Sequence, residues 1–334
     1  MLKIESMHFY KIIFVILIMF TNSKLFSYEE GIAQNGELEI YYRDYGPIDG
    51  EPILLVQGIG GQLINWPEHL IDFLLENNFR PIVYDNRDTG LSSRIQSDSF
   101  SDEKRDNTIV KNYIRYYLRL PIKSDYTLDD MAGDGISVLD KLDISEAHIL
   151  GISMGGMIAQ IIASSHPERT KTFTLIASTA STPSPFNGPT RKVRKLLMDR
   201  TKNPNSTIDE RVARSRKIFT EIGYQGIDLN TEEFYNDVST SIERGGMDDT
   251  GFGRQLNAIL ASQNRIDKVK SISASTLIVH GLEDPLIKVK NAYRANKFIK
   301  GSKLIIIDDM RHLIEPPVFD QFKEDLLEHL QTNK

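Results

Sequence analysis

The sequence contains no cysteine, which excludes disulfide bonds, thiolate metal sites and lipid-modified cysteines. It also lacks an excess of basic residues. With a formal net charge of -6, nucleic acid is not expected as a partner. Hydrophobic residues make up 40% of the 334 positions and charged residues 26%, which predicts an ordinary globular protein. This length fits one core of roughly 250 residues plus an insertion.

A long apolar run is also missing. The apolar stretch near the N-terminus, residues 12–20, is too short to cross about 30 Å of hydrocarbon, so no stable membrane span is expected. It follows two lysines and precedes a polar stretch, which is the order of a secretory signal. We predict a signal peptide over residues 1–27, with Ser23 or Ser27 at the cleavage site and export to the periplasm or beyond. An uncleaved N-terminal membrane anchor and a misassigned start codon are the alternatives.

Short apolar runs alternate with helical patterns along the chain. Continuous apolar character in a short segment predicts a strand that is buried on both faces, as in a parallel sheet. Helices are predicted over residues 127–142 and 154–165, and another begins near Pro67 with Asn65 as its N-cap. This alternation predicts an α/β fold with a mostly parallel, doubly wound sheet. The predicted strands are 37–42, 52–56, 81–84, 147–150, 172–177, 275–279 and 303–307.

The alternation stops over residues 183–270, where charge-rich helical patterns follow three prolines. We expect a helical lid inserted into a core formed by residues 28–182 and 271–334, and a separate domain is the alternative. Residues 97–125 are first polar and then rich in tyrosine, and we assign them no role.

The turn Gly151-Ile152-Ser153-Met154-Gly155 follows a predicted strand and precedes a predicted helix. A G-x-S-x-G turn in this context exposes its serine above the edge of the sheet, so Ser153 is the candidate nucleophile. The helix that begins after it directs backbone N–H groups at developing negative charge. The alternative is a purely structural glycine turn.

A serine hydroxyl needs a base, and the imidazole needs a carboxylate to orient it. His312 follows the last predicted strand and is the candidate base, whereas His280, beside Gly281 at a strand end, is interpreted as structural. Asp284 follows the strand before it and is the candidate acid, with Glu283 as the alternative. The order serine, acid, histidine is that of an α/β hydrolase.

Acyl transfer also needs hydrogen-bond donors for the oxyanion, each worth about 3–4 kcal/mol. We predict the backbone N–H groups of Met154, directly after the nucleophile, and of Ile59, in the glycine-rich loop after residues 52–56. This loop lacks the G-x-x-x-x-G-K-[ST] spacing of a phosphate-binding loop.

These segments together resemble the α/β-hydrolase superfamily over nearly everything after residue 35. Within it, Asn65-Trp66-Pro67 and residues 86–90 are similar to the branch that contains aclacinomycin methylesterase. The resemblance implies an ester hydrolase with Ser153, Asp284 and His312 as its triad. One departure is Gln57, where many members have histidine before the first loop glycine. The resemblance is carried by residues 54–61, 83–92, 151–156, 280–285 and 312.

The sequence therefore predicts hydrolysis of a carboxylic ester of a small molecule with an apolar part, through an acyl-enzyme and without a metal or organic cofactor. A proline-iminopeptidase-like aminopeptidase and an acyltransferase are alternatives on the same fold. The peptidase would need an anionic cluster in the insertion, for which Glu243, Asp248 and Asp249 are candidates. A non-catalytic binding protein is the remaining alternative. A dehalogenase is disfavoured, because its chemistry needs a carboxylate where Ser153 stands.

Overall fold

The computed structural model of the chain describes residues 27–96, 105–180, 188–199, 206–245, 250–262 and 265–332. Residues 1–26 lie outside these ranges, so the signal peptide, its cleavage and the alternative anchor stay predictions. Asp248 and Asp249 of the candidate anionic cluster also lie outside them. No helix within the described ranges is both long enough and apolar enough to cross a membrane.

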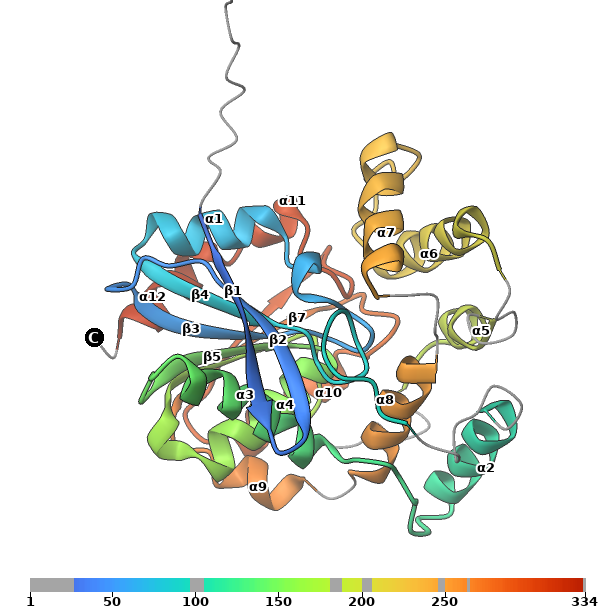
Figure 1. Cartoon of the computed structure of the whole chain (residues 1–334), viewed down its shortest axis with the longest axis horizontal. Helices are drawn as coiled ribbons and strands as arrows, with labels where there is room; N and C mark the ends of the chain where they lie inside the picture. Colours follow the sequence, from blue (N-terminus) through green and yellow to red (C-terminus); the bar gives the residue numbers. More distant parts are fainter. Residues whose placement is uncertain are drawn as a thin grey trace, which may run out of the picture.

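Eight strands form one sheet in the order β1-β2-β4-β3-β5-β6-β7-β8 (Figure 1). Strand β2 pairs antiparallel with β1 and β4, and every other neighbouring pair is parallel. The predicted mostly parallel α/β sheet is confirmed. The strands are β1 (Glu29–Asn35), β2 (Leu38–Asp44), β3 (Glu51–Val56), β4 (Phe79–Tyr84), β5 (Ala147–Ile152), β6 (Thr170–Ile176), β7 (Ser275–Gly281) and β8 (Lys303–Ile307).

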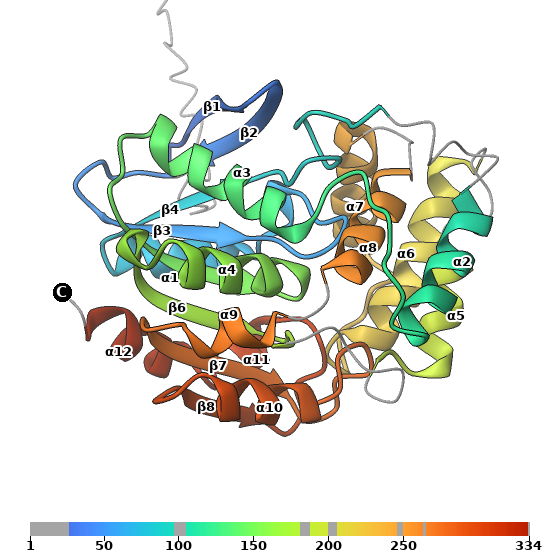
Figure 2. The same ribbon diagram turned by 90° about the horizontal axis from the view of Figure 1, so that it is seen from below.

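Helices cover both faces of this sheet (Figures 1 and 2). Alternate residues of a strand point to opposite faces, so Leu54 and Val56 pack into one hydrophobic core while Ile53 and Leu55 pack into another. One face carries α1 (Glu68–Glu76), α11 (Pro316–Phe319) and α12 (Lys323–Gln331). The other carries α3 (Leu128–Lys141), α4 (Met154–Ser165), α9 (Ile266–Lys270) and α10 (Lys290–Phe298).

A further group of helices lies beyond the carboxyl ends of the parallel strands (Figure 2). Four of them come from the chain between β6 and β7, and the fifth, α2 (Arg105–Tyr117), comes from the segment that the sequence left without a role. A capping box of Thr207 and Glu210 begins α6. The boundaries of the predicted lid stay a prediction. The other four helices are α5 (Arg191–Asp199), α6 (Ile208–Ile222), α7 (Glu232–Gly245) and α8 (Thr250–Ala261).

Two local predictions need correction. Strand β1 was not predicted, because it lies at the sheet edge and buries only Ala33. Asn65 does not cap α1. It ends a short 3-10 helix, η1 (Leu63–Asn65), where its side chain accepts a hydrogen bond from the N–H of Gln62, and Pro67 holds the N-cap position. A second 3-10 helix, η3 (Pro167–Arg169), precedes β6.

Candidate active site

Ser153 occupies a strained turn between β5 and α4. Its backbone angles, φ 57° and ψ -122°, lie in a region that side-chain-bearing residues rarely adopt. The turn is held on both sides. The N–H of Ser153 donates to Ile176 O at 3.0 Å, and the hydroxyl of Ser178 donates to Ser153 O at 2.6 Å. A methyl group at Gly155 would lie 1.9 Å from Val56 O, so only glycine lets the turn pack against β3.

The three residues predicted as a triad meet in one chain of hydrogen bonds. His312 Nε2 lies 3.0 Å from Ser153 Oγ, and His312 Nδ1 lies 2.7 Å from Asp284 Oδ2. An ionised carboxylate can only accept, so Nδ1 carries the proton and Nε2 is free to accept from the serine hydroxyl. All three side chains are buried. This arrangement places a base on the serine and an acid behind the base, as nucleophilic catalysis requires.

Asp284, rather than Glu283, has the geometry of the acid. Its second oxygen, Oδ1, accepts hydrogen bonds of 2.8 Å from the N–H groups of Leu286 and Ile287, which fix the carboxylate. The Glu283 side chain is 60% exposed and lies 4.0 Å from the guanidinium of Arg311. The alternative that the sequence left open thus does not contact the imidazole.

A second imidazole lies beside the acid. His280 is buried, its Nε2 lies 2.6 Å from Ile287 O, and the same atom lies 3.5 Å from Asp284 Oδ2. Burial lowers the pKa of His280, so the ring is neutral at neutral pH and donates from Nε2. It supports the loop that carries Asp284.

One predicted oxyanion donor directly follows Ser153, and the other lies in the loop after β3, where a Cβ at Gly58 would lie 3.2 Å from Ser153 Cβ. Met154 is the first residue of α4, where the N–H has no acceptor within the helix. In the loop after β3, the N–H of Gly58 donates to Gln57 Oε1 and the N–H of Gly60 donates to Gln255 Oε1, both at 2.8 Å. Within the described part of the chain, the N–H of Ile59 between them has no hydrogen-bond partner. The loop therefore leaves the predicted donor free.

The sequence did not assign a role to residues 85–88, which form a buried polar hub next to this loop. Asp85 Oδ2 lies 2.7 Å from Arg244 on α7, and Asp88 Oδ1 lies 2.8 Å from Arg254 on α8. Between them, Asn86 Nδ2 donates to Gln57 O at 3.0 Å. Each of these contacts joins the edge of the sheet to a helix beyond it or to the glycine-rich loop after β3. In the sequence, charged residues directly after a predicted buried strand were the signal that could have identified this hub.

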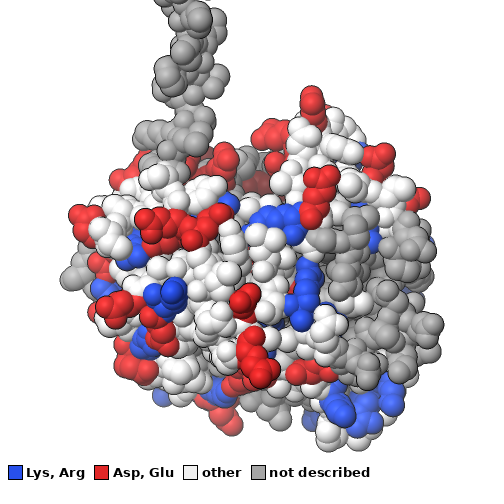
Figure 3. Space-filling view, in the orientation of Figure 1, with Lys and Arg blue, Asp and Glu red and all other residues white. Residues whose placement is uncertain are grey.

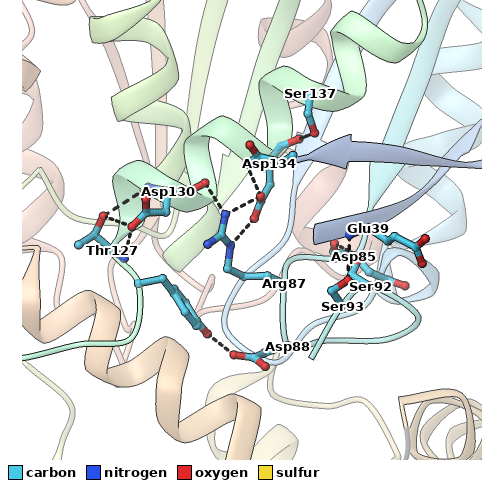
Figure 4. Close-up of polar contacts among 12 residues, drawn as sticks. Glu39, Asp85, Arg87, Asp88, Ser92, Ser93, Thr127, Asp130, Asp134 and Ser137 are labelled. Carbon is cyan, nitrogen blue, oxygen red and sulfur yellow. Dashed lines mark hydrogen bonds and ion pairs between the residues drawn. The ribbon is translucent and has the colours of Figure 1, made fainter. Parts of the chain in front are cut away.

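Arg87 completes the hub on the other side. Its Nε and Nη2 each lie 2.6 Å from an oxygen of Asp134 on α3, which makes a two-bond ion pair (Figure 4). Burial raises the pKa of Asp134, while the Arg87 guanidinium opposes that shift. The same close-up draws Asp88 below this pair, and Asp88 Oδ2 accepts a hydrogen bond of 2.7 Å from the hydroxyl of Tyr126. The hub thus ties β4 to α3 as well as to the helices above the sheet.

The histidine loop is also joined to a helix beyond the sheet. The N–H of His312 donates to Ile222 O at the end of α6 at 2.8 Å, and Arg311 Nη1 donates to Glu221 O at 2.6 Å. A further contact runs in the opposite direction: the N–H of Tyr224, just after α6, donates to Oε1 of Glu315, just after the histidine loop, at 2.8 Å. Within the described residues, no group of three His, Cys, Asp or Glu side chains is arranged to hold a metal ion.

A mostly parallel sheet with a serine, an acid and a histidine in this order at its carboxyl edge defines the chain as an α/β hydrolase. It belongs to the alpha/beta hydrolase fold family, whose model matches residues 51–314. The family predicted from the sequence is confirmed.

Curated relatives include the predicted methylesterase branch. The chain is 23% identical over 313 residues to rhodomycin D methylesterase DnrP of Streptomyces peucetius, covering 89% of this chain and 97% of that protein. It is also 22% identical over 315 residues to a non-heme chloroperoxidase of Burkholderia pyrrocinia, covering 90% and 99%. The predicted resemblance to the methylesterase branch is confirmed at low identity. A protein named for a different activity, the chloroperoxidase, matches this chain over a similar length.

Solved structures agree on the fold. The chain is similar to an enol-lactonase from Burkholderia xenovorans with a TM-score of 0.65 and 19% identity, covering 90% of this chain and 99% of that one. It is also similar to 2-hydroxy-6-oxo-6-phenylhexa-2,4-dienoate hydrolase from a Rhodococcus species, with a TM-score of 0.68, 17% identity, and coverage of 91% and 99%.

Proposed function

We propose that the protein hydrolyses a carboxylic ester of a small molecule through an acyl-enzyme formed on Ser153. The observation that carries this proposal is the continuous hydrogen-bond chain from Ser153 Oγ through His312 to Asp284. The methylesterases among its relatives support the choice of an ester bond.

The reaction would proceed in two halves. Ser153 Oγ attacks the ester carbonyl while His312 Nε2 takes its proton, and the N–H groups of Ile59 and Met154 stabilise the oxyanion. His312 then gives the proton to the departing alcohol, which leaves the acyl group on Ser153. A water molecule repeats the sequence, with His312 as its base, and releases the acid. Asp284 keeps Nδ1 protonated and stabilises the imidazolium.

An apolar part of the substrate is favoured by the residues next to the triad. Leu286 and Leu313 each follow shortly after a triad member and pack on an apolar cluster formed by Val193 of α5 with Ile218 and Ile222 of α6. We propose that these helices belong to a lid over residues 183–270 and that they shape an apolar environment around the acyl or alcohol group. A candidate anionic residue for the peptidase alternative, Glu243, is exposed.

The proposal is tested with Ser153→Ala and a short p-nitrophenyl ester. We expect kcat to fall roughly 10⁶-fold, the scale of loss when a triad serine is removed, with an unchanged circular dichroism spectrum and melting temperature. Ser164→Ala, on the same helix, is the matched control, because the Ser164 hydroxyl only donates to Ile161 O. It should keep full activity.

A fluorophosphonate probe separates this proposal from a non-catalytic binding protein. Intact-mass analysis should show one adduct on the wild type and on Ser164→Ala, and none on Ser153→Ala. Retained turnover or labelling in Ser153→Ala would overturn the proposal. A panel of esters and aminoacyl amides then decides between ester and amide bonds, and addition of alcohols tests for acyl transfer.

A further inference from the structure

Helix α2 lies on the outer side of α8, away from the sheet (Figures 1 and 2). Its inward face is marked by Asn112, which is buried and whose Nδ2 donates to Asn257 Oδ1 of α8 at 2.6 Å. This contact fixes which side of α2 faces the protein.

The opposite side of α2 is apolar and exposed. Val110 and Ile114 stand two residues before and after Asn112, about 160° around the helix from it. These two residues are 51% and 56% exposed, and Tyr117 and Leu118 continue the same face with 44% and 64% exposure. The N–H of Leu118 donates to Ile114 O, so the face extends past the helix end. A contiguous exposed apolar face of this kind marks an interaction surface.

The charge between Val110 and Lys123 is of one sign, with Asp106 one helical turn before this stretch and Asp125 just after it. Residues 110–123 contain four lysines and arginines and no aspartate or glutamate, in a chain with a net charge of -6. Lys111, Arg119 and Lys123 are exposed, and Arg115 lies between the apolar face and the protein. In Figure 3 basic side chains gather at the lower right, where Figure 1 places α2.

We propose that this α2 face binds the surface of a membrane that contains anionic phospholipids. A helix with apolar and tyrosine side chains on one face and cations beside it lies in the interface, with its apolar face about 5–10 Å below the headgroups. The cations meet lipid phosphates, and Tyr117 suits the headgroup level. The contact is peripheral and does not depend on the proposed chemistry of Ser153.

Charge argues for lipid over a second copy of the chain. A symmetric dimer contact places the same patch of two copies against each other. Because residues 110–123 hold no acidic side chain, such a contact would oppose the four cations of one copy to those of the other. An anionic lipid surface instead neutralises them.

The absence of cysteine allows a site-specific test on the full chain. Leu118→Cys carries an environment-sensitive fluorophore, and Ile48→Cys, at a loop position that is 77% exposed, is the matched control. Vesicles of phosphatidylcholine with phosphatidylglycerol should shift the emission at position 118 to the blue and leave position 48 unchanged. Pure phosphatidylcholine should give a weaker shift, and 0.5 M salt should reduce the shift with anionic vesicles.

Vesicle sedimentation of unlabelled variants completes the test. Each cation near an anionic surface contributes about fivefold to binding, so Lys111→Glu with Lys123→Glu should weaken partitioning at least about 20-fold. Ile114→Gln with Leu118→Gln should also weaken it. The control pairs Lys297→Glu with Lys300→Glu and Ile48→Gln with Ile32→Gln change exposed residues elsewhere and should partition like the wild type. All variants should keep wild-type hydrolysis of a soluble ester.

Two outcomes would overturn the proposal. One is equal partitioning of the α2 variants and the wild type, with no lipid-dependent shift at position 118. The other is a shift at that position that grows with protein concentration in the absence of lipid and matches an increase in mass by light scattering, which would assign the face to self-association.

Discussion

The side chain of Gln255 on α8 accepts a hydrogen bond from the backbone N–H of Gly60, with 2.8 Å between N and Oε1. Its Nε2 donates to Arg87 O at 2.9 Å and to Thr89 Oγ1 at 2.7 Å. A buried amide from the segment between β6 and β7 therefore holds the loop of the predicted oxyanion donor Ile59. The segment predicted as the lid therefore also positions the loop of this predicted donor.

We predict that Gln255→Leu lowers kcat by about tenfold to 100-fold with little change in KM. The N–H of Gly60 loses its acceptor, and a loop that moves away from the oxyanion weakens transition-state binding more than substrate binding. Steady-state kinetics on a p-nitrophenyl ester measures this. Asn257→Leu, two residues further along α8, is the control. It loses bonds to Asn112 and Lys123, so it should lower the melting temperature while kcat stays near wild type. Equal kcat losses in both variants would assign Gln255 a purely structural role.

Asp284 and the neighbouring Glu283 provide a matched pair of acids. Asp284→Asn keeps the size of the side chain but no longer holds the Nδ1 proton of His312, so kcat should fall by about 10⁴-fold. Glu283→Gln changes an exposed carboxylate 4.0 Å from Arg311 and should keep activity within about twofold. Activity of both variants across pH 6 to 9 is the measurement. A large loss in Glu283→Gln with activity kept in Asp284→Asn would reverse the assignment.

The buried pair of Arg87 and Asp134 predicts a large stability effect. Asp134→Leu alone should lower the free energy of unfolding by about 3–5 kcal/mol, because it leaves the Arg87 guanidinium buried without a counter-charge. The double variant Arg87→Met with Asp134→Leu should recover much of that loss, since no unpaired charge remains. Urea unfolding followed by the single tryptophan, Trp66, measures these two variants and Arg87→Met alone. Additive losses in the double variant would show that the two side chains do not act as a pair.

Much of the fold was predictable because its strands are buried on both faces. Ile53–Val56 of β3 and Pro81–Tyr84 of β4 are buried throughout, and such runs read as continuous apolar segments. Strand β1 was missed because an edge strand that buries only one alanine leaves no such pattern. The order of Ser153, Asp284 and His312 was predictable for a related reason. Each residue follows a strand, and parallel strands end at the same edge of the sheet.

The supporting contacts were not predictable in the same way. Gln255 lies 195 positions from Gly60, Arg254 lies 166 from Asp88, and Arg244 lies 159 from Asp85. None of these arginines or glutamines follows a strand or belongs to a motif. Their roles depend on how the helices beyond the sheet pack on the loops at its edge, and only the three-dimensional structure gives that arrangement.

His329 on α12 predicts how stability depends on pH. The ring is buried and its Nε2 lies 3.2 Å from Phe173 O, so the neutral form donates there. Burial lowers the pKa of His329 from 6.5 to about 4. Above pH 6.5 the ring is neutral in both the folded and the unfolded chain, and its contribution to stability is fully present. As the pH falls from 6.5 through 4, the unfolded chain takes up a proton that the folded chain resists, and this contribution is lost.

His329→Gln isolates this effect, because the amide can still donate to Phe173 O but does not titrate. Between pH 7 and pH 4.5 the wild type should lose about 2 kcal/mol more of its free energy of unfolding than the variant. Urea unfolding of both proteins at the two pH values gives this difference directly. His166→Gln, at a partly exposed histidine beside Glu168, is the control and should follow the wild type. Parallel pH dependence of His329→Gln and the wild type would show that the acid sensitivity comes from other groups.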